Sequence, residues 1–309
     1  MQQRKYTIFF RKLVLLVVIL VAADWAMGKL LDHFYLRMKG GEAARTSYVM
    51  NTVTRDLLVF GSSRADHHYI PGILKDSLSF DGYNCGTDGQ GILFHYCLLQ
   101  SVMQRHVPRV VILDLQPGEF AVSTISYERL AHLLPYYERH REIRSTVDLR
   151  SPFERIKCFS SLYRFNSFPL TILVNNLVRR NEQVVDGYMP LQGKYDGPLA
   201  TAEGAEWDGP VDSVKLRYFS LFLETAARKG CKVYVFVSPI FMKFTQTPVS
   251  IRLAKDTCAK YGAGFFDYSQ SPRFLENEGL FYDNRHLNGE GAREYTVLVS
   301  GNIKNNTPD

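Results

Sequence analysis

Two short stretches far apart in the chain carry residue types that could together perform nucleophilic acyl transfer. Residues 61–63 read Gly-Ser-Ser directly after an apolar run, and Asp283 and His286 lie three positions apart near the other end. A serine hydroxyl is a weak nucleophile until an adjacent base takes its proton. That base in turn needs a third group that fixes its tautomer and stabilises its charged form. The two stretches therefore predict a Ser-His-Asp arrangement.

The pattern of strands and helices must bring these stretches together. A buried strand ends where its apolar side chains end, and Gly61 allows a sharp bend there, with the next hydroxyl residue at a helix start. Apolar runs at 56–60, 80–85, 109–115, 232–238 and 264–268 alternate with helical periodicity at 69–78, 92–104, 211–229, 248–261 and 289–303. This alternation predicts an α/β fold with a three-layer, flavodoxin-like parallel sheet. Both stretches then fall at the carboxyl edge of the sheet.

Each residue also has a purely structural interpretation when it is taken singly. Ser62 and Ser63 could be no more than helix caps, because strand–Gly–Ser–helix junctions are common. Asp283 could be a turn residue, and His286 a polar surface histidine. The presence of both stretches in one chain is what favours a shared chemical role.

Taken together, these residues resemble the SGNH (GDSL-like) hydrolase superfamily. In the first block of that family the nucleophile follows a glycine and one further residue, which points to Ser63 rather than Ser62. Its last block is Asp-x-x-His, then Leu-Asn and a Gly-Ala helix start, matched by Asp283, His286 and residues 287–292. The resemblance implies that Ser63 is the nucleophile, that His286 is the base and that Asp283 orients it.

The oxyanion hole of that family is only partly matched. Its second block is a glycine whose N–H helps to hold the oxyanion, and the Asn-x-Gly-x-x-Gly run at 84–89 resembles it, with Gly89 favoured over Gly86. The implied donors are the N–H groups of Ser63 and Gly89. The third block, Gly-x-Asn-Asp, is missing, and Gln116 is the candidate substitute there. Losing one such donor costs about 2.7–4 kcal/mol of transition-state stabilisation.

Other polar residues near the first stretch have less specific patterns. Arg64 follows the predicted nucleophile and could bind a substrate carboxylate or phosphate, but a structural salt bridge is the favoured alternative. His67 and His68 are adjacent, so they would point apart on a helix and do not predict a two-ligand metal face. The glycines at 86–91 have the wrong order for a dinucleotide loop. No metal ion and no organic cofactor is predicted.

The first thirty residues have the order of a membrane anchor or a signal peptide. Residues 1–12 contain four Lys and Arg and no acids, and residues 13–23 are unbroken apolar sequence before Asp24 and Trp25. With further apolar residues up to 31, the stretch approaches the ~20 residues of a spanning helix. An anchor with its basic end inside is favoured over a peptide cleaved near 26–28, which would leave a secreted protein. The anchor and the cleaved signal peptide both place the bulk of the protein outside the cytoplasmic membrane.

The residue composition, the charge balance and the cysteine content exclude some classes of function. The length of 309 residues suits one elaborated globular domain or two small ones, and contents of 46% hydrophobic and 22% charged residues are ordinary for a globular protein. Outside residues 1–12 the chain has 33 basic and 31 acidic residues, so nucleic-acid binding is not indicated. Five cysteines without a C-x-x-C pair predict neither a zinc site nor a dense disulfide framework, although one disulfide is left open.

The predicted organisation has an anchor, a linker and one domain with an insertion. The middle third breaks the strand–helix rhythm with Tyr- and Arg-rich helical pieces followed by Gly/Pro/Asp-rich loops, and the resemblance does not cover it. The expected segments are an anchor or signal at 1–31, a linker at 32–54, an α/β domain at 55–303 with an insertion at 119–210, and a tail at 304–309.

The order of these segments also resembles membrane-anchored members of the family that are linked to acylation of cell-surface polymers. The resemblance implies an extracytoplasmic serine esterase or O-acyltransferase, with a polysaccharide bearing acyl (above all acetyl) esters as substrate and a membrane acyltransferase as a further partner. Because the third block is missing, a second hypothesis is a non-catalytic accessory protein that keeps the fold and binds a polymer or a membrane acyltransferase. A third is a membrane-tethered structural protein, in which Ser63 and His286 would lie far apart. The sequence specifies neither the acyl group nor the acceptor.

Overall fold

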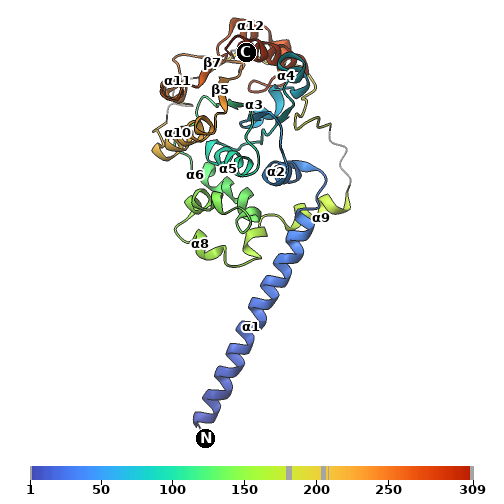
Figure 1. The fold of residues 1–309 in the computed structure, drawn as a ribbon, viewed down its shortest axis with the longest axis vertical. Coiled ribbons are helices and arrows are strands. Elements are labelled where there is room, and N and C mark those ends of the chain that lie inside the picture. Colours follow the sequence, from blue (N-terminus) through green and yellow to red (C-terminus); the bar gives the residue numbers. More distant parts are fainter. Residues whose placement is uncertain (1, 179–182, 203–206, 208, 307–309) are drawn as a thin grey trace. The chain divides into compact units, whose positions relative to one another are not determined.

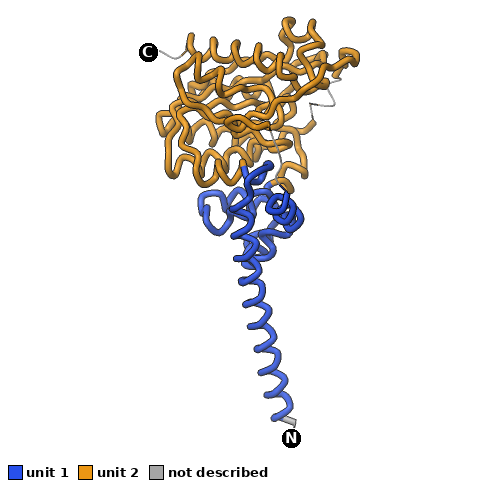
Figure 2. The backbone as a smooth tube through the Cα atoms, turned by 90° about the vertical axis from the view of Figure 1, so that its right-hand side faces the viewer, with its two compact units in different colours: residues 1–44, 130–181 blue, residues 45–129, 182–309 orange. Residues whose placement is uncertain are grey.

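A computed structural model describes residues 2–178, 183–202, 207 and 209–306 of the chain (Figure 1). It divides into two compact units: unit 1 comprises residues 1–44 and 130–181, and unit 2 comprises 45–129 and 182–309 (Figure 2). The predicted insertion at 119–210 is therefore shared between the two units. Residues 179–182, 203–206 and 208 of that insertion, and 307–309 of the predicted tail, lie outside the described residues.

Unit 2 is built on a five-stranded parallel sheet with the strand order β2-β1-β3-β5-β7. Its strands are β1 (Leu57–Phe60), β2 (Gly82–Asn84), β3 (Val110–Asp114), β5 (Lys232–Val237) and β7 (Gly264–Asp267). Counted among these five strands alone, this is the 2-1-3-4-5 order of flavodoxin-like sheets. The predicted α/β class with a parallel sheet is confirmed. A separate parallel pair consists of β4 (Ala200–Ala202) and β6 (Met242–Phe244).

Helices cover both faces of the sheet, which gives three layers. On one face, Val59, Ile112 and Phe236 belong to a buried cluster with side chains of three helices: α3 (Ser63–His68), α4 (Pro71–Leu78) and α13 (Gly289–Asn306). On the other face Phe60 packs against Phe222, with the ring centroids 5.7 Å apart. The helices of that face are α5 (Ile92–Met103), α10 (Ser213–Arg228) and α11 (Val249–Tyr261). Strand residues alternate between the two faces, as the pleat requires.

The long N-terminal helix α1 (Gln2–Tyr35) belongs to unit 1. By length and composition it could cross a membrane, and its apolar window is exposed along its whole length. At its C-terminal end Tyr35 is buried, and its ring contacts Tyr136, Phe165 and Phe168 edge-on. The segment expected to be a linker, 32–54, contains this helix end and the helix α2 (Gly41–Asn51).

The remaining elements are short. In unit 1 they are η2 (Arg141–Ile143), α7 (Arg144–Val147), η3 (Asp148–Arg150), α8 (Glu154–Lys157), η4 (Tyr163–Phe165) and α9 (Pro169–Leu177). Those of unit 2 are α6 (Thr124–Glu128), α12 (Pro272–Leu275) and η6 (Glu278–Leu280), while η1 (Arg129–Tyr136) crosses from unit 2 into unit 1.

The bend after β1 depends on Gly61. Its φ of +141° is rarely adopted by other residues, and an added Cβ would lie 2.7 Å from the carbonyl oxygen of Asp114 and 2.8 Å from the Cβ of Ala65. Strand β1 therefore turns into α3 at a place with no room for a side chain.

We predict that Gly61→Ala lowers the free energy of unfolding by about 1–3 kcal/mol, because the substitution adds both strain and a steric clash. Gly72→Ala is the matched control, since an added Cβ at this helical position has no neighbour within 4 Å. The control should be neutral or more stable by up to about 1 kcal/mol. Urea unfolding in one fixed detergent measures both, and equal midpoints for the two variants would refute the role of Gly61.

Candidate active site

Three residues singled out in the sequence meet at the carboxyl edge of the sheet. Ser63 Oγ lies 2.8 Å from His286 Nε2, although the two residues are 223 positions apart. His286 Nδ1 lies 2.9 Å and 3.0 Å from the two carboxylate oxygens of Asp283. Because a carboxylate can only accept, Nδ1 carries the proton and Nε2 is left to accept from the serine. The hypothesis of a purely structural protein predicted that Ser63 and His286 lie far apart, and this separation is not observed.

Only the second of the two serines contacts the histidine. Ser62 precedes α3 and is buried, and its carbonyl oxygen accepts a hydrogen bond from the Asp66 N–H at 3.1 Å. Ser63 is the first residue of α3 and is only half-buried. The position of Ser63 therefore leaves its hydroxyl accessible, whereas Ser62 belongs to the packed turn.

Arg64 does not face the site. Its guanidinium is buried and donates to the carbonyl oxygens of Leu115 at 2.5 Å and Ser238 at 3.2 Å, just beyond the ends of β3 and β5. It also pairs with Asp114 at 3.3 Å. The predicted alternative of a substrate-binding arginine is therefore corrected: these contacts make Arg64 a structural link between α3 and two strand ends.

Two further side chains of α3 are also held by distant segments. Both carboxylate oxygens of the buried Asp66 accept from the guanidinium of Arg45. His67 donates from Nδ1 to the carbonyl oxygen of Met189 at 2.7 Å, because a carbonyl can only accept. This leaves His67 Nε2 directed at the exposed carboxylate of Asp88, 3.7 Å away.

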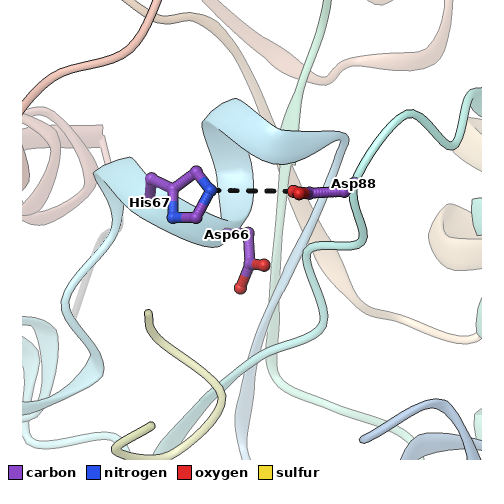
Figure 3. A group of neighbouring side chains, drawn as sticks. All are labelled: Asp66, His67 and Asp88. Atoms are coloured by element: carbon purple, nitrogen blue, oxygen red, sulfur yellow. Dashed lines mark ion pairs between the residues drawn. The ribbon is translucent and has the colours of Figure 1, made fainter. Parts of the chain in front are cut away.

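Asp66, His67 and Asp88 have ligand atoms close enough together to suggest a metal site. Figure 3 shows the carboxylate of Asp88 facing the ring of His67, while the carboxylate of Asp66 points away from both. The oxygens of Asp66 are already engaged by Arg45, so this group offers one nitrogen and one carboxylate. A pair of ligands falls short of the three or four protein ligands of a zinc site.

His68 links α3 to the loop that carries the base, a contact that the sequence did not reveal. Its Nε2 accepts a hydrogen bond from the backbone N–H of Leu287 at 2.9 Å, one residue beyond His286. Its ring also packs edge-on against the ring of His286, with centroids 6.2 Å apart. The serine and the base are thus connected by a second contact besides their own hydrogen bond.

The loop from 281 to 288 is closed by its own hydrogen bonds. Asp283 Oδ1 accepts from the backbone N–H groups of Arg285 at 2.7 Å and His286 at 2.8 Å, in addition to the imidazole. Burial raises the pKa of Asp283, but the hydrogen bonds from His286 and Arg285 outweigh it and the pKa is lowered overall. The side chain of Asn288 then caps α13 by accepting from the N–H groups of Glu290 and Gly291. Asp283 is therefore ionised and fixed beside the base at neutral pH.

Of the two glycines considered for the oxyanion hole, Gly86 is already engaged. Its N–H donates to the side chain of Asn84 at 2.9 Å, and an added Cβ would lie 2.3 Å from the backbone nitrogen of Asp66. Gly89 is exposed, with a φ of +65°, and its carbonyl accepts from Arg129. Within the described residues, the N–H groups of Ser63 and Gly89 donate to no other protein group. Both therefore stay available as the predicted donors.

The place of the missing third block is occupied by a loop after β3. Gln116 is half-buried, and its backbone carbonyl oxygen accepts from the Glu119 N–H at 3.0 Å. Glu119 Oε1 accepts from the N–H of Ile92 at 2.7 Å, at the start of α5. Burial raises the pKa of Glu119 to about 7, against the opposing effect of that hydrogen bond. The donor role of Gln116 stays a prediction.

The indole of Trp207 lies against two loops, those of residues 281–288 and 115–119, and no sequence motif pointed to it. The guanidinium of Arg285, in the loop of the base, lies 5.3 Å from the ring of Trp207. A Cβ added to Gly118, in the loop after β3, would lie 3.0 Å from the same indole. Trp207 therefore lies against the loop that contains Asp283 and His286 and against the loop after β3.

The comparisons with known proteins do not assign this chain to a family. No protein-family model and no curated protein matches the sequence. Among solved structures, the chain is similar to a crystal structure from Bacteroides fragilis of a protein described provisionally as an acylhydrolase. The two share 12% sequence identity and a TM-score of 0.40, over 86% of this chain and 98% of that one. The roles of the residues therefore depend on the geometry of the site.

The buried position of His68 predicts a pH dependence of stability. Burial lowers the pKa of His68 well below its ordinary value of 6.5, so the imidazole is neutral in the fold. Below pH 6.5 the unfolded chain binds a proton that the folded chain does not bind, and stability falls as the pH falls. Glutamine at this position can accept the same N–H without titrating.

We expect the free energy of unfolding of the unsubstituted protein, relative to that of His68→Gln, to fall by about 1 kcal/mol per pH unit between pH 6.5 and 5, with the slope approaching about 1.4 kcal/mol per unit at the acid end. Urea unfolding of both proteins at pH 7.5, 6.0 and 5.0 gives this difference, in which the other titrating groups cancel. A difference that does not change with pH would show that folding leaves the pKa of His68 unchanged, against the expected effect of burial.

Proposed function

We propose that the chain is a serine esterase or O-acyltransferase whose nucleophile is Ser63. The observation that carries this proposal is the continuous line of hydrogen bonds from Ser63 through His286 to Asp283, with the tautomer that a general base requires. A half-buried serine with this base and this orienting carboxylate fits acyl transfer better than a structural role.

In the proposed reaction, His286 Nε2 accepts the proton of Ser63 while Oγ attacks the acyl carbonyl. The N–H groups of Ser63 and Gly89 donate to the oxyanion that forms, and Asp283 stabilises the imidazolium. The imidazolium returns its proton to the leaving alcohol, which departs and leaves an acyl-Ser63 ester. A second alcohol or water, deprotonated by His286, then takes the acyl group. Hydrolysis and transfer differ only in that acceptor.

We place this site outside the cytoplasmic membrane, with α1 as an uncleaved anchor. The helix continues without a break from the apolar run to Tyr35, which is buried among aromatic rings of unit 1. The alternative cleavage region at 26–28 lies inside this helix, and at Gly28 an added Cβ would lie 2.2 Å from the Cβ of Ser161. Removing residues 1–28 would take away a packed part of unit 1, which favours the anchor.

We propose a polysaccharide with acyl esters as the substrate class. The resemblance to membrane-anchored SGNH proteins that act on cell-surface polymers motivates this choice. Trp207 supports it, since its ring lies near both Gly118 and Arg285, in the two loops beside the triad. The apolar faces of sugar rings pack on aromatic side chains, and a large flat ring near the base would suit such a ligand.

A second candidate function is an accessory protein that binds an acylated polymer without turning it over. The loop after β3 favours it, because Gln116 occupies the place where the related enzymes have an additional oxyanion donor. The two candidates share the binding site and differ in whether Ser63 forms a covalent bond.

We predict that a fluorophosphonate probe labels the purified full-length protein at Ser63. The serine displaces fluoride and becomes phosphonylated, which needs activation by a base, so labelling should disappear in Ser63→Ala. Ser62→Ala is the matched control and should keep most of the labelling, since Ser62 makes no contact with His286. A fully folded protein that takes up no label would leave the accessory function as the better account.

We predict that Asp283→Asn lowers the kcat for hydrolysis of a chromogenic acetyl ester by about 10⁴-fold, because the amide would hold the wrong histidine tautomer. The exposed Asp256→Asn on α11 is the control and should keep full activity. The assay should be run with and without sugar acceptors, which separates hydrolysis from transfer. Activity of Asp283→Asn within a few-fold of the unsubstituted protein would exclude Asp283 from the mechanism.

A further inference from the structure

Unit 1 has a cavity beside the point where the apolar part of α1 ends. The cavity has a volume of about 680 Å³, and Trp25 of α1 lines it together with Arg141, Arg144, Arg155 and Arg164. Trp25 follows the apolar run of residues 13–23 with only Asp24 between them. Tryptophan is enriched at the boundary between the hydrocarbon core and water. The arginines therefore lie at the depth at which lipid phosphates are found.

Asp24, which precedes Trp25, is bound to the folded part of unit 1. Its carboxylate accepts from the Ser160 hydroxyl at 2.5 Å and from the backbone N–H groups of Ser161 at 2.7 Å and Leu162 at 3.2 Å. The N-terminal part of α1 projects beyond the rest of unit 1 (Figure 2). Residues 160–162 thus lie against α1 at the end of its apolar run.

The segment just before these residues exposes large apolar side chains to solvent. Phe159 is 83% exposed, Ile156 is 65% exposed and Phe153 is 64% exposed. We call these three residues, with Arg141 and Arg155, the seating face. Large exposed apolar groups next to cationic ones are unusual on a soluble surface and typical of proteins that lie in a bilayer interface.

The charges of the cavity favour an anionic headgroup. Arg164 pairs with Glu138, and Arg144 donates to backbone carbonyls of residues 137 and 138. Arg141 and Arg155 are exposed, and within the described part of the chain they form no ion pair or hydrogen bond. Guanidinium groups bind phosphate through paired hydrogen bonds, which suits two uncommitted arginines beside a cavity.

We infer that the seating face of unit 1 lies in the membrane interface, with Phe153, Ile156 and Phe159 among the lipids and Arg141 and Arg155 bound to the phosphates of anionic lipids. This rests on the proposed anchoring by α1 and is independent of the proposed chemistry of Ser63. Its consequence is that lipid contacts of the seating face, together with α1, set the depth of unit 1 at the bilayer.

The depth of the seating face can be measured on the full-length protein in nanodiscs that contain phosphatidylglycerol. All five native cysteines are buried, so an introduced surface cysteine takes a fluorophore selectively. The test variant is Phe159→Cys, and the in-unit control is Leu177→Cys, which is exposed beside Asn176. Asn176 donates to the carbonyl oxygen of Phe34, ten residues and about 15 Å further along α1 than Asp24. Val17→Cys reports whether α1 itself is inserted.

Spin-labelled lipids should quench the probes at positions 17 and 159 at least several-fold more than the probe at position 177. Quenching at 17 but equal responses at 159 and 177 would overturn the inference while leaving the anchor intact. No quenching at 17 would overturn the anchor and the seating face together. Esterase activity is not used, so neither result depends on the proposed reaction.

The headgroup preference has its own test by native mass spectrometry of the full-length protein in detergent. Each arginine near an anionic surface contributes about fivefold to binding, so Arg141→Gln/Arg155→Gln should bind phosphatidylglycerol about tenfold or more weakly. Binding of phosphatidylcholine should not change. The control is Arg217→Gln/Arg252→Gln, two exposed arginines of unit 2. Equal binding of phosphatidylglycerol by the two double variants would contradict the arginine contacts.

Discussion

The position of the serine depends on side chains of α3 that reach out of the helix. With six residues, α3 is too short to be stable on its own. Arg64 ties it to the ends of β3 and β5, and Asp66 ties it to an arginine of α2. His67 and His68 tie it to two loops. Rotation of α3 would break all these contacts at once, so tertiary structure fixes the direction of the Ser63 hydroxyl.

These contacts also join Ser63 to the loop of His286 across a long stretch of sequence. His68 holds the backbone just after His286, while Asp283 closes the same loop from within. Several groups involved are buried and charged or polar, and removing one partner of a buried ion pair typically costs 3–5 kcal/mol. The arrangement is thus rigid because its alternatives leave buried groups unpaired, which suits a site that must keep a hydrogen bond aligned through a reaction.

Sequence reasoning found those parts of the fold and site whose signals are local. Continuous apolar runs predicted all five strands of the main sheet, and the short motifs around Ser63 and His286 were enough to bring these residues together. The role of His68 could not be predicted, because its partner is a backbone N–H that any residue at position 287 would present. Arg64 was left with two interpretations, since its type does not tell whether a guanidinium faces a cleft or two strand ends. Trp207 could not be placed for a similar reason: its neighbours come from loops without regular periodicity.

The central claim is that Ser63 forms a covalent ester during turnover, and trapping that ester tests it most directly. The full-length protein would be mixed with an activated acetyl ester, quenched in acid within milliseconds and digested for peptide mass spectrometry. The account predicts one acetyl group on Ser63, formed in a burst before steady state and missing from His286→Ala. An acetyl group on another residue, or product release without any acylated peptide, would contradict it.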